Sequence, residues 1–117
     1  MGESVVKTKS FDLAVSGVNF YKFIVAEKKE YIMSKQFLRS RTSVSANVRE
    51  AINAQSKADF IHKLAIAQKE CDETMYWLEL LNATAYISES EFKLMHEKSN
   101  EVLKIIRSII ITSKKNS

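Results

Sequence analysis

The shortage of residues that make tight turns is the strongest constraint on what this chain can fold into. Its 117 residues include no proline and only two glycines, Gly2 and Gly17. Turns that reverse a chain within a few residues depend on glycine at positive φ or on proline, so a sheet with many hairpins has almost nothing to build its turns from. A chain of this length holds about one domain with one core. We therefore expect residues 1–117 to form a single all-α domain.

Four stretches have the apolar spacing of amphipathic helices. The expected helices cover residues 10–29, 34–54, 56–83 and 88–113. Ser10 is placed to cap the first, and Ser56 with Asp59 and Ser88 with Glu91 resemble capping boxes at the starts of the third and fourth. Long helices joined by connections of a few residues fit an antiparallel up-and-down four-helix bundle.

Charge and cysteine content limit the partners and the compartment. The chain has 18 Lys and Arg against 14 Asp and Glu, a net charge of +4, which permits nucleic-acid binding without requiring it. The single cysteine, Cys71, cannot form an internal disulfide, and no secretory signal pattern opens the chain. The longest aliphatic run, residues 105–111, is interrupted by Arg107 and Ser108 and is far shorter than the roughly 20 apolar residues of a membrane span. We expect a cytoplasmic protein that does not enter a membrane.

The first helix is apolar on two sides. The face expected in the core consists of Phe11, Ala14, Val15, Val18, Tyr21 and Val25. The opposite face also carries large apolar residues, namely Leu13, Phe20, Phe23 and Ile24. A helix with two apolar faces needs two neighbours, so the second face is expected to contact another subunit.

The third helix carries aromatic residues away from its core stripe. The stripe expected in the core consists of Phe60, Leu64, Ala67, Cys71, Met75, Leu78 and Leu81. Off this stripe lie Ile66, Tyr76, Trp77 and Leu80. Scattered exposed apolar residues occur on every surface, but Trp and Tyr are enriched at interface centres. Together with the second face of the first helix, they favour a homo-oligomer over a monomer.

The second helix has a basic side. Lys35, Arg39 and Arg49 fall opposite its apolar stripe, where they could neutralise phosphates, although any exposed helix face is normally charged. Arg41 instead projects into the apolar arc, where an unpaired charge is costly. Its stem either extends to the edge of the arc, or its guanidinium pairs with a carboxylate of another helix or subunit.

The sequence shows no complete catalytic or metal-binding set. A di-metal bundle site needs inward glutamates and Glu-x-x-His pairs. The nearest match is Asp59 with His62, and Lys93 stands where His96 would need a carboxylate. Cys71 lies within an apolar stripe, where a thiol is usually a buried hydrophobe. We therefore expect a non-catalytic protein without a metal or other cofactor.

Three segments resemble a known family. They are KSFDLAV at residues 9–15, QFLRSRTSVSANVREA at 36–51 and SKADFIHKLAIAQKECDETMYWLELL at 56–81. In order and spacing they resemble the 23S ribosomal RNA intervening-sequence proteins, a family of four-helix bundles, over nearly the whole chain.

The resemblance implies a left-handed up-and-down bundle without enzymatic activity. Relatives of this family, including the accessory protein of diversity-generating retroelements, assemble as five-fold barrels, so the resemblance implies a pentamer. It also implies nucleic-acid binding through a basic surface. This chain differs where relatives often carry glycine or another small residue, because Arg41 and Ser45 stand at those positions.

Two functions stay open. The first is a non-catalytic oligomer that binds RNA or DNA, with or without a partner protein, through Lys35, Arg39, Arg41 and Arg49. The alternative is a structural or protein-interaction oligomer without nucleic-acid binding. In either case the expected oligomer interface consists of Leu13, Phe20, Phe23, Ile24, Ile66, Tyr76, Trp77 and Leu80.

Overall fold

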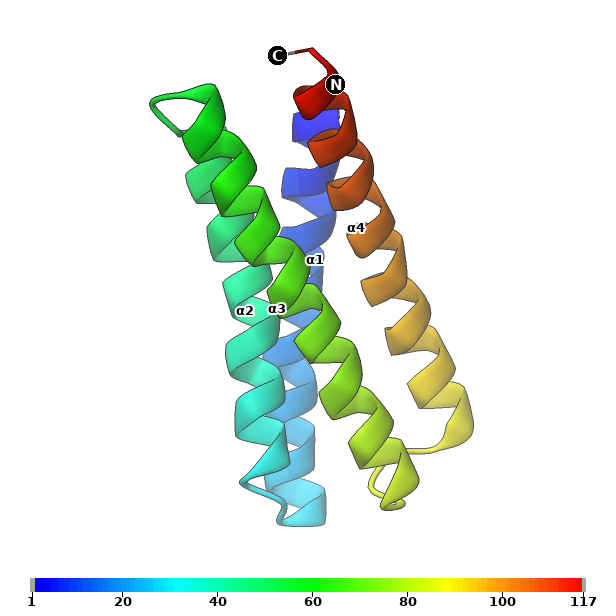
Figure 1. The fold of residues 1–117 in the computed structure, drawn as a ribbon. Coiled ribbons are helices and arrows are strands. Elements are labelled where there is room, and N and C mark those ends of the chain that lie inside the picture. The colour runs from blue at the N-terminus through cyan, green and yellow to red at the C-terminus, as the bar shows by residue number, and fades with distance from the viewer. Residues whose placement is uncertain (1, 117) are drawn as a thin grey trace.

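The protein is an all-α bundle of four long helices. The structure is a computed structural model that describes residues 2–116. In chain order its elements are α1 (Gly2–Phe23), which continues into the π-helical turn η1 (Ile24–Lys28), then α2 (Met33–Ile52), α3 (Lys57–Ala83) and α4 (Glu89–Lys115). Neighbouring helices are antiparallel, and α1 begins at the same end of the bundle at which α4 finishes (Figure 1). The all-α up-and-down bundle expected from the sequence is confirmed.

The starts of α3 and α4 use the serines expected to cap them. Ser56 Oγ accepts a hydrogen bond from the backbone N–H of Asp59 at 3.0 Å. At α4 the box is reciprocal, because Ser88 Oγ accepts from the N–H of Glu91 at 3.1 Å and a Glu91 carboxylate oxygen accepts from the N–H of Ser88 at 3.0 Å. These bonds satisfy backbone donors that the first turn of a helix leaves unpaired.

The first helix begins earlier than expected, at Gly2 instead of Ser10. Ser10 is fully buried within α1, and its hydroxyl donates to the Lys7 carbonyl oxygen at 3.2 Å. A serine whose hydroxyl bonds back to its own helix can occupy the helix interior. The expected boundary was wrong because the same residue type serves as a cap and as a tolerated interior residue.

A carboxylate caps α2. Glu30 Oε2 accepts hydrogen bonds from the N–H groups of Ile32 and Met33 at 2.9 Å each, and Oε1 accepts from the N–H of Ser34 at 2.7 Å. Burial by itself raises the pKa of Glu30, but the backbone hydrogen bonds outweigh it and hold the pKa below its usual value. Lys29, at φ 57°, supplies the left-handed residue that ends η1 in the absence of a glycine.

The buried face of α1 differs from the face expected in the core. Alternating spacings of three and four define the buried seam, which consists of Val6, Ser10, Leu13, Gly17, Phe20 and Ile24. Phe11, Val15 and Val18, expected in the core, are 50%, 44% and 37% exposed. Counting apolar residues selected the wrong face, because the true seam contains a serine and a glycine.

This exchange of faces also corrects the expected subunit interface. Leu13, Phe20 and Ile24 were expected to contact another subunit, but all three are buried in the core of the single chain. Phe23 alone of that set on the first helix is exposed. Phe11, Val15 and Val18, on the face expected in the core, are exposed instead.

The core consists of two hydrophobic clusters. The cluster nearer the chain ends contains Val6, Leu13, Val44, Val48, Ala51, Leu64, Ala67, Cys71, Met75, Val102, Leu103, Ile106 and Ile110. The other contains Phe20, Ile24, Phe37, Leu78, Leu81 and Ile87. In α1, α2 and α4 small or polar buried residues fall between the residues that contact the two clusters, and in α3 Thr74 lies one residue before Met75, the last member of the first cluster on that helix. These residues form what we call the polar layer, namely Gly17, Ser40, Arg41, Thr74 and Ser99.

Within the polar layer, the Arg41 side chain packs across Gly17. A Cβ atom at position 17 would lie 3.1 Å from Cδ and 3.3 Å from Cγ of Arg41, closer than ordinary carbon contacts. Arg41 is 0% exposed. Glycine is therefore required on α1 where α2 places an arginine stem.

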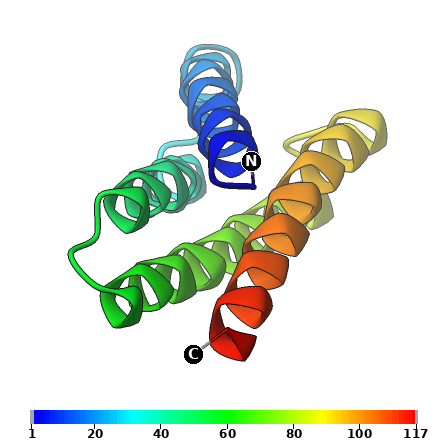
Figure 2. The same ribbon diagram turned by 90° about the horizontal axis from the view of Figure 1, so that it is seen from above.

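Helices α1 and α4 are the neighbours in the bundle that touch least. Viewed along the bundle, α1 stands apart from much of α4, whereas α2 and α3 lie against each other (Figure 2). No helix among residues 2–116 combines the length and apolar composition that crossing a membrane requires.

Gly17→Ala is expected to destabilise the wild-type protein but to stabilise an Arg41→Ala variant. In the wild type the new methyl group crowds a buried stem, and overpacking costs about 1–3 kcal/mol. Without that stem, the gain in helix propensity of about 1 kcal/mol is left. Urea unfolding of the wild type, both single variants and the double variant measures the two effects. An equal effect of Gly17→Ala in both backgrounds would contradict the contact.

Glu30→Gln is expected to lower the free energy of unfolding by about 1–2 kcal/mol at neutral pH, because a single amide oxygen replaces two carboxylate acceptors. Since folding lowers the pKa of Glu30, its contribution is fully present above the usual value of 4.5 and is lost as the pH falls through the folded value. Thermal unfolding from about pH 7 to pH 3 is expected to show the two proteins converging in acid. A difference that is constant over this range would contradict the role of the carboxylate.

Candidate functional site

The four cations of the second helix that were expected to bind nucleic acid lie in different environments. Lys35 and Arg49 are both exposed, in the first and last turns of α2, and lie roughly 21 Å apart along the helix axis. Arg39 is partly exposed and paired with acidic residues, and Arg41 is fully buried. The four side chains therefore do not form a continuous basic surface.

Arg39 joins α2 to α3. Its Nη1 donates to Glu70 Oε2 at 3.1 Å, and its Nη2 donates to Glu73 Oε1. The hydrogen bond to Glu70, followed by that to Glu73, raises the pKa of Arg39. Burial raises the pKa of Glu73, but the hydrogen bond from Arg39, the further hydrogen bonds and the charge of Arg39 together outweigh it, so the net direction is downward. The charge of Arg39 is already compensated within the chain.

The prediction that Arg41 binds nucleic acid was wrong, because a side chain that is 0% exposed cannot contact a nucleic acid at the surface. Its guanidinium carbon lies 5.0 Å from the centroid of the Phe37 ring, within the range of a cation–π contact. Burial lowers the pKa of Arg41 to about 10, so the guanidinium is still charged at neutral pH. Its Nε, Nη1 and Nη2 have no hydrogen-bond partner among the described residues.

Arg49, in the last turn of α2, lies beside an exposed aromatic ring of α1. Its guanidinium carbon is 5.9 Å from the centroid of the Phe11 ring on α1, and Phe11 is 50% exposed. A surface depression of about 330 Å³ surrounds the pair, lined by Ser4, Lys7, Thr8, Phe11, Asp12 and Arg49. Phe11 is thus a surface residue, although its apolar spacing predicted a core position.

The positive charge of the chain is concentrated at the end of the bundle where α1 begins and α4 finishes (Figure 1). We call this region, residues 2–12, 43–67 and 104–116, the basic end. It contains nine basic residues, namely Lys7, Lys9, Arg49, Lys57, Lys63, Lys104, Arg107, Lys114 and Lys115. Four acidic residues fall in the same ranges, against nine basic and ten acidic residues in the rest of the chain. The net charge of +4 therefore arises entirely from the basic end.

Most cations of the basic end are available to a partner. Lys9 pairs with Glu101 at 3.1 Å and Lys63 with Glu50 at 3.0 Å. The others are exposed and form no ion pair with another described residue, namely Lys7, Arg49, Lys57, Lys104, Arg107, Lys114 and Lys115. These cations are distributed over all four helices, which explains why one-helix patterns found only Arg49 among them.

The remaining residues of the expected subunit interface keep part of their surface exposed. Tyr76 is 54% and Phe23 42% exposed. Ile66, Trp77 and Leu80 are half-buried, and the Trp77 ring packs edge-on to Tyr76 with centroids 4.9 Å apart.

Cys71 and the histidines do not form a reactive cluster. Cys71 is buried, as expected, and its Sγ donates to the Ser99 carbonyl oxygen at 3.2 Å. Burial raises the pKa of Cys71 to about 12, so its thiol is neutral at physiological pH. His62 is exposed, and His96 Nε2 lies 3.4 Å from Glu79. Within the described part of the chain, no three His, Cys, Asp or Glu side chains gather closely enough to hold a metal ion.

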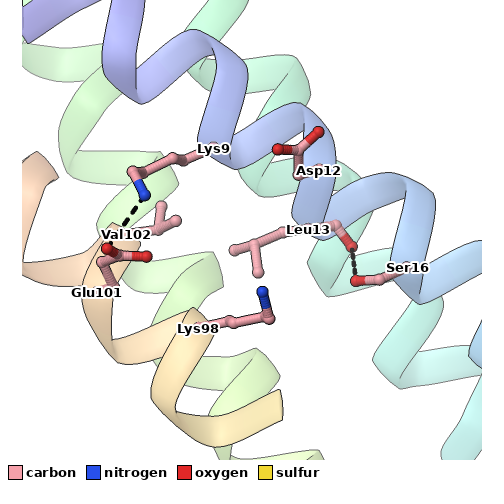
Figure 3. Close-up of a pocket in the computed structure, with 7 residues that line it drawn as sticks. All are labelled: Lys9, Asp12, Leu13, Ser16, Lys98, Glu101 and Val102. Atoms are coloured by element: carbon pink, nitrogen blue, oxygen red, sulfur yellow. Dashed lines mark hydrogen bonds and ion pairs between the residues drawn. The ribbon is translucent and has the colours of Figure 1, made fainter. Parts of the chain in front are cut away.

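A groove of about 310 Å³ separates α1 from α4. It is lined by Lys9, Asp12, Leu13, Ser16, Lys98, Glu101 and Val102. Figure 3 shows the Lys9–Glu101 ion pair crossing one part of the groove and the Lys98 nitrogen directed toward Leu13. The groove exists because α1 and α4 pack less closely than the other neighbours.

Known proteins are similar to this chain in sequence and in fold. Residues 3–108 match the family described as 23S rRNA-intervening sequence protein. The chain is also similar to a crystal structure of a protein with unknown function from the S23 ribosomal protein family of Bacteroides thetaiotaomicron. The two are 55% identical, with a TM-score of 0.93 over 94% of this chain and 98% of that chain. No curated protein matches the chain.

Proposed function

The chain belongs to the 23S rRNA-intervening sequence protein family, and from this premise we propose that it is a non-catalytic, oligomeric protein that binds RNA or DNA through the basic end. The observation that carries the proposal is the location of the entire net positive charge at one end of the bundle. Of the four cations expected to bind on α2, only Arg49 belongs to this end.

The chemistry of the basic end suits a phosphate backbone. Exposed lysines and arginines that neutralise phosphates release counterions, which gives affinity that falls steeply with salt. Seven of the cations there form no ion pair with another described residue, so binding does not require breaking an internal pair. The exposed Phe11 ring beside Arg49 adds an aromatic face on which an unpaired base can stack.

Binding of a labelled RNA hairpin, measured by fluorescence anisotropy over a range of salt concentrations, tests the proposal. The triple variant Arg49→Ala, Lys104→Ala, Arg107→Ala is expected to bind at least about ten-fold more weakly at low salt. Its salt slope is expected to be smaller, by roughly one for each phosphate that the protein no longer neutralises.

The matched control removes the same charge elsewhere. The triple variant Lys22→Ala, Lys35→Ala, Lys93→Ala replaces exposed lysines outside the basic end and is expected to keep wild-type affinity within about two-fold, because local contacts dominate over net charge at moderate salt. Equal decreases in affinity in the two variants, or no binding by the wild type at low salt, would overturn the proposal.

The second candidate function is that of a structural or protein-interaction oligomer, and a separate observation favours it. Phe11, Val15 and Val18 form an exposed apolar stripe on α1, at i, i+4 and i+7. Exposed apolar surface of this kind is typical of protein interfaces. The five-fold assembly implied by the family resemblance provides a partner in further copies of the same chain.

Light scattering is expected to give a mass about five times the 13.4 kDa of one chain. Val15→Lys places a charge within the stripe and is expected to shift the mass toward the monomer while the helical circular dichroism is retained. Leu94→Lys is the matched control, because Leu94 is an exposed leucine of α4, outside the stripe. A wild-type monomer at micromolar concentration would rule out the assembly.

A further inference from the structure

The polar layer contains a buried charge that the chain does not compensate. Arg41 is 0% exposed, and all three guanidinium nitrogens lack a hydrogen-bond partner among the described residues. No described carboxylate lies within ion-pair distance of it. Leaving a buried charge unpaired costs several kcal/mol, and the Phe37 ring at 5.0 Å offsets only part of that cost.

The other polar groups of the layer are already engaged. Thr74 Oγ1 donates to Ser40 Oγ at 3.0 Å, and Ser40 Oγ donates to the Phe37 carbonyl oxygen at 3.0 Å. Ser99 Oγ donates to the Met95 carbonyl oxygen at 3.0 Å. Cys71, which interacts electrostatically with Arg41, carries a neutral thiol at physiological pH. Arg41 is therefore the member of the layer whose hydrogen-bond donors are unpaired.

The α1–α4 groove is lined in part by residues that are next in sequence to members of the polar layer. Ser16 and Lys98 line the groove, and they directly precede Gly17 and Ser99 of the polar layer. The stem of Arg41 packs directly against the backbone of Gly17, which has no side chain to block it. Lys98 contributes a positive charge to the groove wall, whereas the charge of Lys9 is compensated by Glu101 (Figure 3). Asp12 is the acidic residue on this path without an ion-pair partner among the described residues.

We propose that the polar layer is a binding site for a small oxyanion, a carboxylate or phosphate group that enters along the α1–α4 groove and is held by the Arg41 guanidinium. A planar guanidinium presents a fork of parallel N–H donors that matches two oxygens of such a group. A nucleic-acid backbone is too large to enter between packed helices, whereas a small ion reaches a side chain that is 0% exposed when the loosely packed α1 and α4 separate locally. This site is distinct from the basic end and does not depend on the nucleic-acid proposal.

Thermal unfolding at constant ionic strength tests the site, with sodium chloride replaced by sodium phosphate or by sodium acetate. Either oxyanion, at ten times its dissociation constant or more, is expected to raise the melting temperature of the wild type by about 4–8 °C. Arg41→Met retains the length of the apolar stem and removes the fork, so the rise is expected to disappear. Lys22→Met, which removes an exposed charge of α1, is the matched control and is expected to keep the rise.

The two salts identify the source of the oxyanion. A rise with phosphate alone assigns a phosphate group, and a rise with acetate alone assigns a carboxylate. An equal rise in the wild type and in Arg41→Met would reveal a general salt effect and overturn the proposal, as would the absence of any rise in the wild type.

A measurement on the wild type alone keeps the test independent of how well Arg41→Met folds. The Nε–H resonance of Arg41 is followed by nuclear magnetic resonance while inorganic phosphate or acetate is added. A saturable shift of this resonance is expected for the anion that binds. A resonance that does not respond to either anion overturns the proposal.

Discussion

The packing of Arg41 across Gly17 determines how the interior of this bundle is organised. Arg41 is the largest fully buried side chain of the protein, and it occupies a seam position between two apolar neighbours, Phe37 and Val44. Only a residue without a side chain on the facing helix leaves room for its stem. The hydrophobic core is consequently divided into two clusters, and the layer between them contains Gly17 of α1 and buried polar side chains of α2, α3 and α4. The α1–α4 groove lies between the two neighbouring helices that touch least, and its lining residues Ser16 and Lys98 directly precede Gly17 and Ser99 of this layer.

In α2, arginines that are close in the sequence have different electrostatic roles. Arg39 and Arg41 are separated by about 200° around α2, so one meets the carboxylates of α3 at the surface and the other enters the core. Arg49 lies near the opposite end of the helix, against Phe11. A basic surface predicted from one helix therefore separates into a structural ion pair, a buried charge and a member of the basic end. The basic end itself is assembled from all four helices, and its cations are far apart in the sequence.

The two apolar faces of α1 are a second consequence of the interior layer. The seam of α1 that packs in the core includes Ser10 and Gly17, so it is less hydrophobic than a seam made only of large apolar residues. Phe11, Val15 and Val18 are left on the outside, where they provide apolar area for a partner. The composition of α1 allows either face to be buried, and the helices that pack against it determine which one is.

The sequence by itself determined the fold class, the number of helices and the starts of α3 and α4, because these depend on local chemistry. The absence of proline and the rarity of glycine exclude a turn-rich sheet, and the capping residues Ser56 and Ser88 mark helix starts through contacts within one turn. The burial of Cys71 and the inward direction of Arg41 also follow from helical periodicity. Only the tertiary structure decided which face of α1 is buried, that Gly17 accommodates Arg41, and that cations from separate helices meet at one end. These features depend on the register between helices, which is set by side chains distant in the sequence and is not encoded in the periodicity of any single segment.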